Sequence, residues 1–250
     1  MGDFEFKNIT DKEEQGHMVD FIKRYEWLGS VSQYTTHWFG AYYKGILSGV
    51  VLFNVPNSFS KIVGEDTEYK ERLISRGACI SWSPKNLASA LIMFSIKWMV
   101  KNTPYRVFTA YADPEAKELG TIYQACNFYY LGNNFGTKKK YINPYTNKPV
   151  SDRAFRQKSM YKRIAKELNI PWDKTWSHRT GMSWENVPDD VETKLKEESK
   201  RKEKEAEKIK ITPKHKYVYI LGKNKKETKE LKKIFKTRNK TYPYPKERGR

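Results

Sequence analysis

Asp113 stands between two segments of different character. The preceding residues, YRVFTAYA (105–112), have the apolar and aromatic composition of a strand, and Pro114 then opens EAKELGTIYQAC, which has the pattern of a helix. Asp-Pro is a good helix start, because the carboxylate accepts hydrogen bonds from free N–H groups and proline suits the first helical position. Strand ends in α/β folds also open onto ligand clefts. The sequence therefore predicts a helix cap, a carboxylate that takes part in chemistry, or both.

Two further side chains are of types that suit chemistry. Arg76 interrupts the apolar strand ISRGACISW, and a buried arginine needs an anionic partner. The candidates are a phosphate or carboxylate of a bound molecule, or Asp113 itself; the alternative is an edge position from which Arg76 faces water. His37 begins HWFGAYY, and a lone histidine is more often structural or exposed. No spacing such as HxxxH accompanies it, so the local sequence predicts no metal site there.

Cations are mixed with aromatic and hydroxyl side chains in GTKKKYINPYTNK (136–148) and DRAFRQKSMYKR (152–163). This mixture suits a grip on phosphates combined with stacking on bases. A solvated helix face is the alternative for the second stretch. The candidate nucleic-acid contacts are Lys138, Lys139, Lys140, Arg153, Arg156, Lys158, Lys162 and Arg163.

The positive charge is unevenly placed along the chain. Of 48 basic and 29 acidic residues, 14 of each lie in 1–137, so the whole net charge of +19 comes from 138–250. This asymmetry predicts a catalytic or ligand-binding core (1–137) and a basic extension (138–250) packed on it, which binds a polyanion. Nucleic acid is the commonest such partner, and a solvated charged tail is the alternative for part of the extension. A helix charged almost all round is expected at about 189–210.

The order of the elements predicts the fold class. A first helix is followed by a hairpin of two strands, HWFGAYY and GILSGVVLF, and then by alternating strands and helices as far as FYYLG. KHKYVYILG and KKETKELKKIF predict one more strand and helix near the C-terminus. We therefore expect an α/β protein with a mixed sheet flanked by helices.

The segment GTIYQACNFYYLG (120–132) resembles the last helix and strand of the Gcn5-related N-acetyltransferase fold. ISRGACIS and the helix after it stand where that family binds acyl-CoA. There a glycine-rich turn presents backbone N–H groups to the pyrophosphate. The corresponding turn here, SWSPKN (81–86), departs from that pattern, which disfavours acyl-CoA as the donor. Ser83 and Lys85 are the candidate donor contacts in this turn, with a helix cap as the alternative for Ser83.

A narrower resemblance covers five motifs in order. HWFG, SRGACIS, YADPEAKELGTIYQACNFYYLG, KHKYVYILG and YPYPK look like the phage Mom family. The resemblance implies an acetyltransferase-like fold and an enzyme that adds a carbamoylmethyl-type group to the N6 amine of adenine in DNA, protecting the DNA from restriction. Because N6 is buried in the duplex, such an enzyme must act on a base turned out of the stack or on a locally single strand.

The same resemblance implies roles for individual residues. Asp113 or His37 would take the proton from the amine or hold a transition metal such as iron. Tyr123 corresponds to the helix tyrosine of acetyltransferases and would donate a proton to the leaving group, with a packed core position as the alternative. Arg76, from its place in an apolar strand, would orient the donor. An aminoacyl-tRNA and an acyl-CoA both remain options for the donor. Double-stranded DNA is the expected partner, with tRNA as an optional second one, and a dimer is left open.

Composition limits the setting and leaves two rival functions. Cys79 and Cys126 lie in apolar stretches without a close-spaced ligand pattern, which favours buried thiols in a reducing cytoplasm, that of an infected bacterium if the resemblance holds. No signal peptide and no apolar run of about 18 residues is expected. The rivals are an N-acyltransferase acting on a protein or small amine and a non-catalytic nucleic-acid-binding protein.

Overall fold

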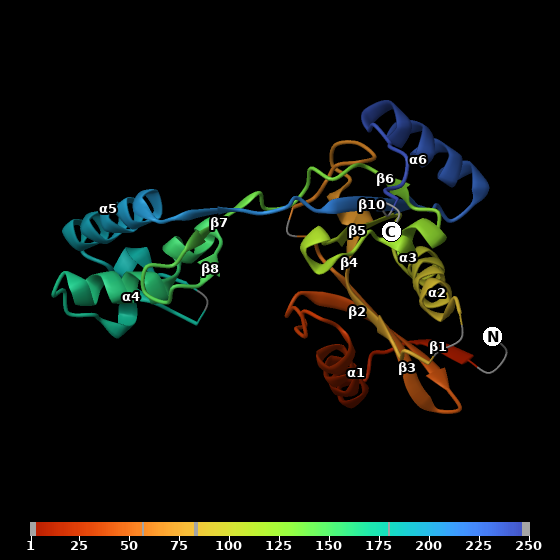
Figure 1. The fold of residues 1–250 in the computed structure, drawn as a ribbon, viewed down its shortest axis with the longest axis horizontal. Coiled ribbons are helices and arrows are strands. Elements are labelled where there is room, and N and C mark those ends of the chain that lie inside the picture. The colour runs from red at the N-terminus through yellow and green to blue at the C-terminus, as the bar shows by residue number, and fades with distance from the viewer. Residues whose placement is uncertain (1–3, 57, 83–84, 180, 247–250) are drawn as a thin grey trace. The chain divides into compact units, whose positions relative to one another are not determined.

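The computed structural model describes residues 4–56, 58–82, 85–179 and 181–246 (Figure 1). The contacts divide the chain into two units. The first unit consists of Met1–Phe135 together with Lys214–Arg250, and the second unit is Gly136–Pro213. None of the helices in the described part of the chain is long and apolar enough to cross a membrane.

A mixed sheet of seven strands forms the centre of the first unit. All neighbouring strands are antiparallel except β4 and β5, which are parallel. In spatial order the strands are β1 (Phe4–Asn8), β2 (Thr35–Tyr43), β3 (Ile46–Asn54), β4 (Glu71–Cys79), β5 (Val107–Ala112), β10 (His215–Ile220) and β6 (Tyr129–Tyr130).

Helices cover both faces of this sheet. One face packs on α2 (Leu87–Asn102) and α3 (Thr121–Ala125), through a core that contains Phe39, Phe108 and Phe128. Alternate residues of the strands face the other side, where they pack on α1 (Lys12–Tyr25) and α6 (Lys225–Arg238). Two short 3-10 helices, η1 (Glu68–Lys70) and η2 (Pro114–Ala116), precede β4 and follow β5. The predicted α/β class, a mixed sheet flanked by helices, is confirmed.

An irregularity in β4 separates it from β5. The two strands pair only from Glu71–Ile74 to Val107–Ala110. The register between β3 and β4 shifts between Leu52 and Phe53, so that Ser75 is an extra residue on β4. Beyond this bulge β4 stays paired with β3, while β5 stays paired with β10. The parallel strands therefore part toward their carboxyl ends.

The last part of the chain belongs to the first unit, which corrects the predicted extension 138–250. β10 lies between β5 and β6 and pairs antiparallel with both. After α6 the chain returns across β6, where Tyr242 N–H donates to the Tyr130 carbonyl at 2.9 Å and the Tyr244 hydroxyl donates to the Phe128 carbonyl at 2.8 Å. Only 136–213 form a separate body.

The second unit has its own sheet and core. Its strands have the spatial order β8, β7, β9, and its core contains Phe155, Ile164 and Leu195. The expected charged helix at 189–210 is shorter, because α5 ends at Glu205 and is followed by a strand; it is also packed rather than solvated all round, since Leu195 is fully buried. The elements are β7 (Lys139–Ile142), β8 (Pro149–Val150), η3 (Asp152–Arg156), α4 (Lys158–Glu167), η4 (Lys174–Trp176), η5 (Trp184–Asn186), α5 (Asp189–Glu205) and β9 (Lys208–Lys210).

Candidate active site at the β4–β5 opening

A cavity of about 380 Å³ lies where β4 and β5 part. Gly77 of β4 and Ala112 of β5 line it, together with the segment Lys117–Tyr123 that leads into α3. Gly77 has no side chain, and Ala112 has only a methyl group, so neither fills the opening. The bulge at Ser75 and the end of β5 therefore create a space at the carboxyl ends of two parallel strands, the place where α/β sheets bind ligands.

Asp113 follows directly on Ala112 at the edge of this cavity. One carboxylate oxygen accepts a hydrogen bond from the Glu115 N–H at 3.1 Å, so Asp113 caps η2 as the sequence predicts. The other oxygen pairs with the Lys214 ammonium at 2.7 Å, and the Asp113 side chain is 14% exposed. The predicted cap is thus present, and the charge of Asp113 is balanced by a lysine from the far end of the chain.

Tyr123 lines the cavity from α3. Its ring packs against Phe128 and Tyr217, with centroids 5.4 and 5.5 Å apart. Burial raises the pKa of the Tyr123 hydroxyl, and the nearby carboxylates of Glu118 and Glu26 raise it further. The hydroxyl is therefore protonated at neutral pH, which suits a proton donor.

Glu118 is a site residue that the sequence analysis missed. Its carboxylate lies on the cavity wall and accepts two hydrogen bonds, from the Trp27 indole N–H at 2.8 Å and from the Asp113 backbone N–H at 3.0 Å. Trp27 is 59% exposed beside it. Because Trp27 and Glu118 are 91 residues apart, no local pattern could have indicated that they meet.

Arg76 has a different partner from those predicted. Past the bulge its side chain turns to the face of α1, where Nε donates to the Ser30 carbonyl at 2.6 Å and lies 3.8 Å from a Glu26 carboxylate oxygen. Glu26 also accepts the N–H groups of Leu28 and Gly29. The anionic partner of Arg76 is therefore Glu26, not Asp113, and the pair fixes the segment that carries Trp27.

His37 lies apart from the cavity. Its ring contacts Trp98 and Tyr105, its Nδ1 lies 3.0 Å from the Thr36 hydroxyl, and burial with the positive charge of Arg72 lowers its pKa. β3 and β4 separate β2 from β5, and at about 4.8 Å per strand this places His37 roughly 14 Å from the line of β5.

The metal pair implied by the family resemblance is thus not formed. His37 and Asp113 lie on separate strands, and no described group of three or more His, Cys, Asp or Glu residues could hold a metal ion. The described residues do not fit an iron site.

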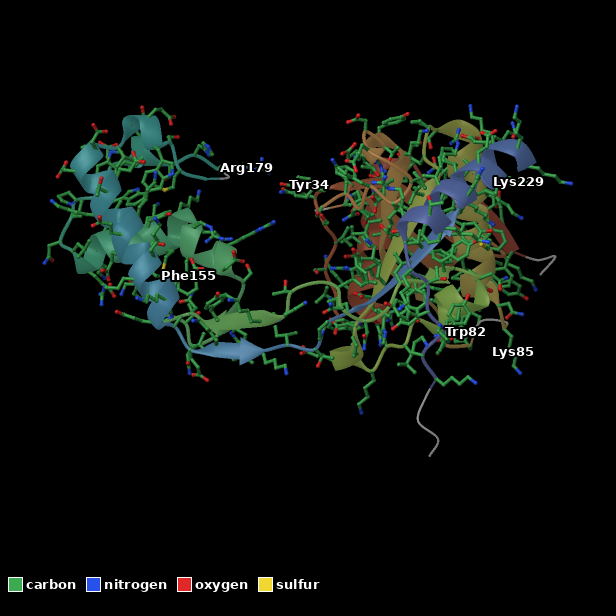
Figure 2. The ribbon with its side chains drawn as sticks, turned by 90° about the horizontal axis from the view of Figure 1, so that it is seen from above. Tyr34, Trp82, Lys85, Phe155, Arg179 and Lys229 are labelled. Carbon is green, nitrogen blue, oxygen red and sulfur yellow. The ribbon has the colours of Figure 1, made fainter. Side chains whose placement is uncertain are left out.

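The turn before α2 bears on the donor. Ser83 lies outside the described residues, and Asn86 with a positive φ of 74° occupies the N-cap position. Lys85 and Trp82 are exposed at this turn, with Trp82 68% exposed (Figure 2). The turn offers a cation and an aromatic ring where a glycine-rich loop is absent.

Several of the cations predicted to contact nucleic acid are used within the second unit. Arg156 pairs with Asp152 and Glu203, and Lys158 donates to the His178 carbonyl at 2.8 Å. Three others lie over aromatic rings: Lys162 over Trp172, Arg163 over Tyr145 and Lys139 over Tyr141. Arg153 and Lys138 are exposed, and Lys140 is half-buried. Contact of these residues with nucleic acid stays a prediction.

Comparisons with known proteins give one family and a set of distant structures. The model of the Mom protein family matches residues 3–180. No curated protein sequence is significantly similar to the chain.

Solved structures with partial similarity are acetyltransferases. The putative acetyltransferase YncA from Salmonella typhimurium, with its cofactor acetyl-CoA, has 11% identity and a TM-score of 0.40, over 52% of this chain and 83% of its own. Arabidopsis thaliana NAA60 in complex with acetyl-CoA has 15% identity and a TM-score of 0.42, over 53% and 88%. The ribosomal-protein-S18-alanine N-acetyltransferase from Escherichia coli has 10% identity and a TM-score of 0.39, over 59% and 94%.

Proposed function

The chain belongs to the Mom protein family, and from that premise we propose that it is a transferase that adds a small acyl-derived group to the N6 amine of adenine in DNA. The observation that supports this proposal most directly is the cavity between β4 and β5, which a protonated Tyr123 and Glu118 line, with Asp113 next to the lining residue Ala112. Protection of phage DNA from restriction would be the biological consequence.

The chemistry explains why these groups are needed. The lone pair of the N6 amine is delocalised into the adenine ring, so the amine is a poor nucleophile. It must be held against the reacting carbon of the donor while one group removes its proton and another protonates the leaving group. In the proposal Tyr123 protonates the leaving group. Asp113, by family resemblance, or Glu118, by its place on the cavity wall, takes the amine proton.

The target base must leave the duplex to reach this cavity. A volume of 380 Å³ falls within the range of about 300–1,000 Å³ that is usual for small-molecule sites, and a base would fill part of it. Trp27, exposed and held in place by Glu118, offers a ring on which an extruded base can stack. Its hydrogen bond to Glu118, a residue of the cavity wall, gives the enzyme an aromatic platform for adenine.

Two classes of donor fit the proposed reaction. An aminoacyl-tRNA and an acyl-CoA both carry an activated carbonyl and phosphate groups, and the exposed Lys85 at the start of α2 is a contact for such a phosphate. Purified protein and DNA are incubated with each donor in turn, and the donor that is consumed is identified.

Mass spectrometry of nucleosides tests the proposed function. DNA from cells that express the wild-type chain should contain a modified deoxyadenosine, and Tyr123→Phe should reduce its amount by about 100-fold, because a general acid typically contributes at least that much. The ring contacts of Tyr123 remain in this variant, so its melting temperature should be nearly that of the wild type.

Two results would contradict the proposed function and favour another one. Unmodified DNA together with acylated proteins or amines would favour an N-acyltransferase of another substrate class. Unmodified nucleosides with tight, salt-sensitive DNA binding would favour a non-catalytic nucleic-acid-binding protein.

A further inference from the structure

Most of the positive charge of the molecule lies on the first unit, in a part of the chain that the charge pattern alone assigned to the extension. Residues 214–250 contain 14 basic and three acidic residues, whereas residues 136–213 contain 20 basic and 12 acidic ones. The net excess is thus +11 on the returning segment and +8 on the second unit. α6 holds seven of the 14 basic residues of the returning segment, six of them lysines.

The lysines of α6 occupy one face of the helix. Leu231 and Phe235 are buried and fix the opposite face against the sheet. At 100° per residue, the lysines fall within an arc of about 120° centred away from the sheet. This lysine face consists of Lys225, Lys226, Lys229, Lys232, Lys233 and Lys236.

Four of these lysines form a straight row. Their spacing of four, three and four residues puts Lys225, Lys229, Lys232 and Lys236 in line along the helix. With a rise of 1.5 Å per residue the row is about 17 Å long. Figure 2 shows Lys229 pointing away from the body of the first unit.

The lysine face is not neutralised by carboxylates. Among the described residues, the carboxylates of this region pair with other cations: Glu227 pairs with Arg106 at 2.9 Å, and Glu65 pairs with Arg238 and Lys61, each at 2.8 Å. Within α6, Lys232 lies over the ring of Tyr129, 5.8 Å from its centroid.

The charged helix of the second unit differs in this respect. On α5 four of the six cations are paired within the helix or with α4, in Lys194–Asp190, Lys196–Glu192, Arg201–Glu198 and Lys202–Glu167. α6 therefore carries more unpaired cations than α5. A groove of about 760 Å³ runs between the loop Leu221–Asn224 and these lysines, lined by their aliphatic stems with the ammonium groups free to reach out.

We propose that the lysine face of α6 binds the phosphate backbone of duplex DNA. One strand of a duplex presents a phosphate about every 3.4 Å of helix axis, so a 17 Å row covers the axial length of about five phosphates. Single-stranded nucleic acid is bound on surfaces that also offer aromatic rings for stacking, but the lysine face has none, because Phe235 is buried. The row therefore suits a duplex, and the choice of DNA over RNA rests on the proposed function.

The position of α6 gives this contact a use. The residues that follow α6 contact α3 and the residues just after it. The Tyr244 hydroxyl donates to the Phe128 carbonyl, and the Gln124 amide donates to the Pro245 carbonyl at 3.5 Å. Tyr123 belongs to the same short helix. DNA held on α6 is thus held on the unit that contains the cavity, whatever the second unit does.

The test compares two variants of the full chain that lose the same charge. In one, Lys225, Lys229, Lys233 and Lys236 of α6 are changed to Gln; in the other, the exposed Lys194, Lys196, Lys200 and Lys204 of α5 are changed to Gln. Binding to a labelled duplex of about 30 base pairs is measured by fluorescence anisotropy over a range of salt concentrations. The melting temperatures of both variants are compared with that of the wild type.

The α6 variant should bind duplex DNA more weakly, and the slope of log K against log salt should fall by about 3 to 4, since each lost phosphate contact removes about 0.9. The α5 variant should keep the wild-type slope within about one. A wild-type slope in the α6 variant would overturn the inference while leaving the proposed function intact. Absence of duplex binding by the wild type would overturn both.

Two further probes test the choice of polymer. A single-stranded DNA of the same length and an RNA duplex of the same sequence are titrated alongside. Weaker binding of both than of duplex DNA, with the α6 substitutions affecting the DNA duplex most, supports the inference. An α6-dependent affinity for the RNA duplex or the single strand that exceeds that for duplex DNA would overturn it.

Discussion

Individual side chains of the candidate site act in linked pairs. The Asp113 backbone N–H donates to Glu118, the Asp113 carboxylate pairs with Lys214, and Glu118 accepts from Trp27. A change in either carboxylate therefore disturbs the other through one hydrogen bond. Variants that keep shape and remove charge separate their roles.

Asp113→Asn keeps a good helix cap but removes the charge. Its melting temperature should be close to that of the wild type, because the pair with the 41% exposed Lys214 is worth at most about 1 kcal/mol. DNA modification should fall by about 100-fold if the carboxylate takes the proton. Asp113→Ala loses the cap as well, at a cost of about 0.5–2 kcal/mol in the free energy of unfolding.

Glu118→Gln is the matched comparison for this experiment. If Asp113→Asn is active and Glu118→Gln is inactive, Glu118 is the group that takes the proton from the amine. If both variants stay fully active, the cavity does not carry acid–base chemistry. Melting temperature and nucleoside composition are measured for all three variants.

His37 is expected to make stability depend on pH. Burial and Arg72 lower its pKa in the folded chain below the ordinary value of 6.5. The folded state therefore binds the proton more weakly than the unfolded state, so the contribution of His37 is full above about pH 6.5 and is lost as the pH falls through the lowered pKa.

His37→Gln should remove this dependence. Its melting temperature should change less than that of the wild type between about pH 7.5 and pH 5.5. His215, whose pKa burial also lowers, is present in both proteins, so its contribution cancels in the comparison. Equal slopes for wild type and His37→Gln would show that the His37 ring is solvated.

At the scale of elements, a glycine joins the cavity wall to the core. Gly120 precedes α3 with a positive φ of 69°, and a Cβ there would lie 2.4 Å from the ring of Tyr217. That ring packs on Tyr123. The turn into α3 thus depends on a residue without a side chain.

Gly120→Ala should destabilise the chain by about 2–4 kcal/mol, from backbone strain of about 1 kcal/mol and displacement of Tyr217 by about 1–3 kcal/mol. Gly45→Ala is the control, since Gly45 has a similar positive φ of 80° but nothing within 4 Å of the added Cβ. Urea unfolding of both variants measures the difference. An equal loss in both would show that Tyr217 moves aside at no cost.

Elements defined by local patterns were predictable, and their neighbours in space were not. The dense apolar residues of LASALIMFSIKWMVKN (87–102) predicted α2, and the hairpin of β2 and β3 followed from its strand composition. β1 was not predicted because FEFKN has only five residues, two of which are charged. The insertion of β10 between β5 and β6 leaves no local signal, since its partners are about 100 residues earlier.

The same distinction holds for the site. The cap at Asp113 could be read from Asp-Pro, because a cap is a local structure. The meetings of Trp27 with Glu118 and of Arg76 with Glu26 could not, because each depends on packing between distant segments. The direction of the Arg76 side chain depends on one extra residue in β4, which reverses the alternation of faces.

For the whole molecule, the second unit is an insertion in the first. The chain leaves at Phe135 and returns at Lys214, and the two residues exchange backbone hydrogen bonds of 3.3 and 2.8 Å. A chain that ends at Thr137 would lack β10, although this is where the charge pattern placed the end of the core. The first unit is therefore obtained by removing residues 136–213 from within the chain, and not by ending the chain at Thr137.

Replacement of 136–213 by a short Gly-Ser linker should leave a protein that unfolds cooperatively, because the linker joins two residues that already touch. A chain that stops at Pro213 should be insoluble or unfolded, since β5 and β6 lose the strand between them. Thermal unfolding and gel filtration of both proteins decide the matter. A folded, monomeric 1–213 protein would contradict the central place of β10.

The insertion also affects how the protein is made. The ribosome completes Phe135 before β10 exists, and it must then add the 78 residues of Gly136–Pro213. At about 5–20 residues per second this takes roughly 4–16 s. During that time the nascent sheet has an unpaired edge on β5 at the surface of the ribosome, where it is a binding site for chaperones or for a neighbouring nascent chain. The synthesis of the second unit therefore sets the delay before the sheet of the first unit closes.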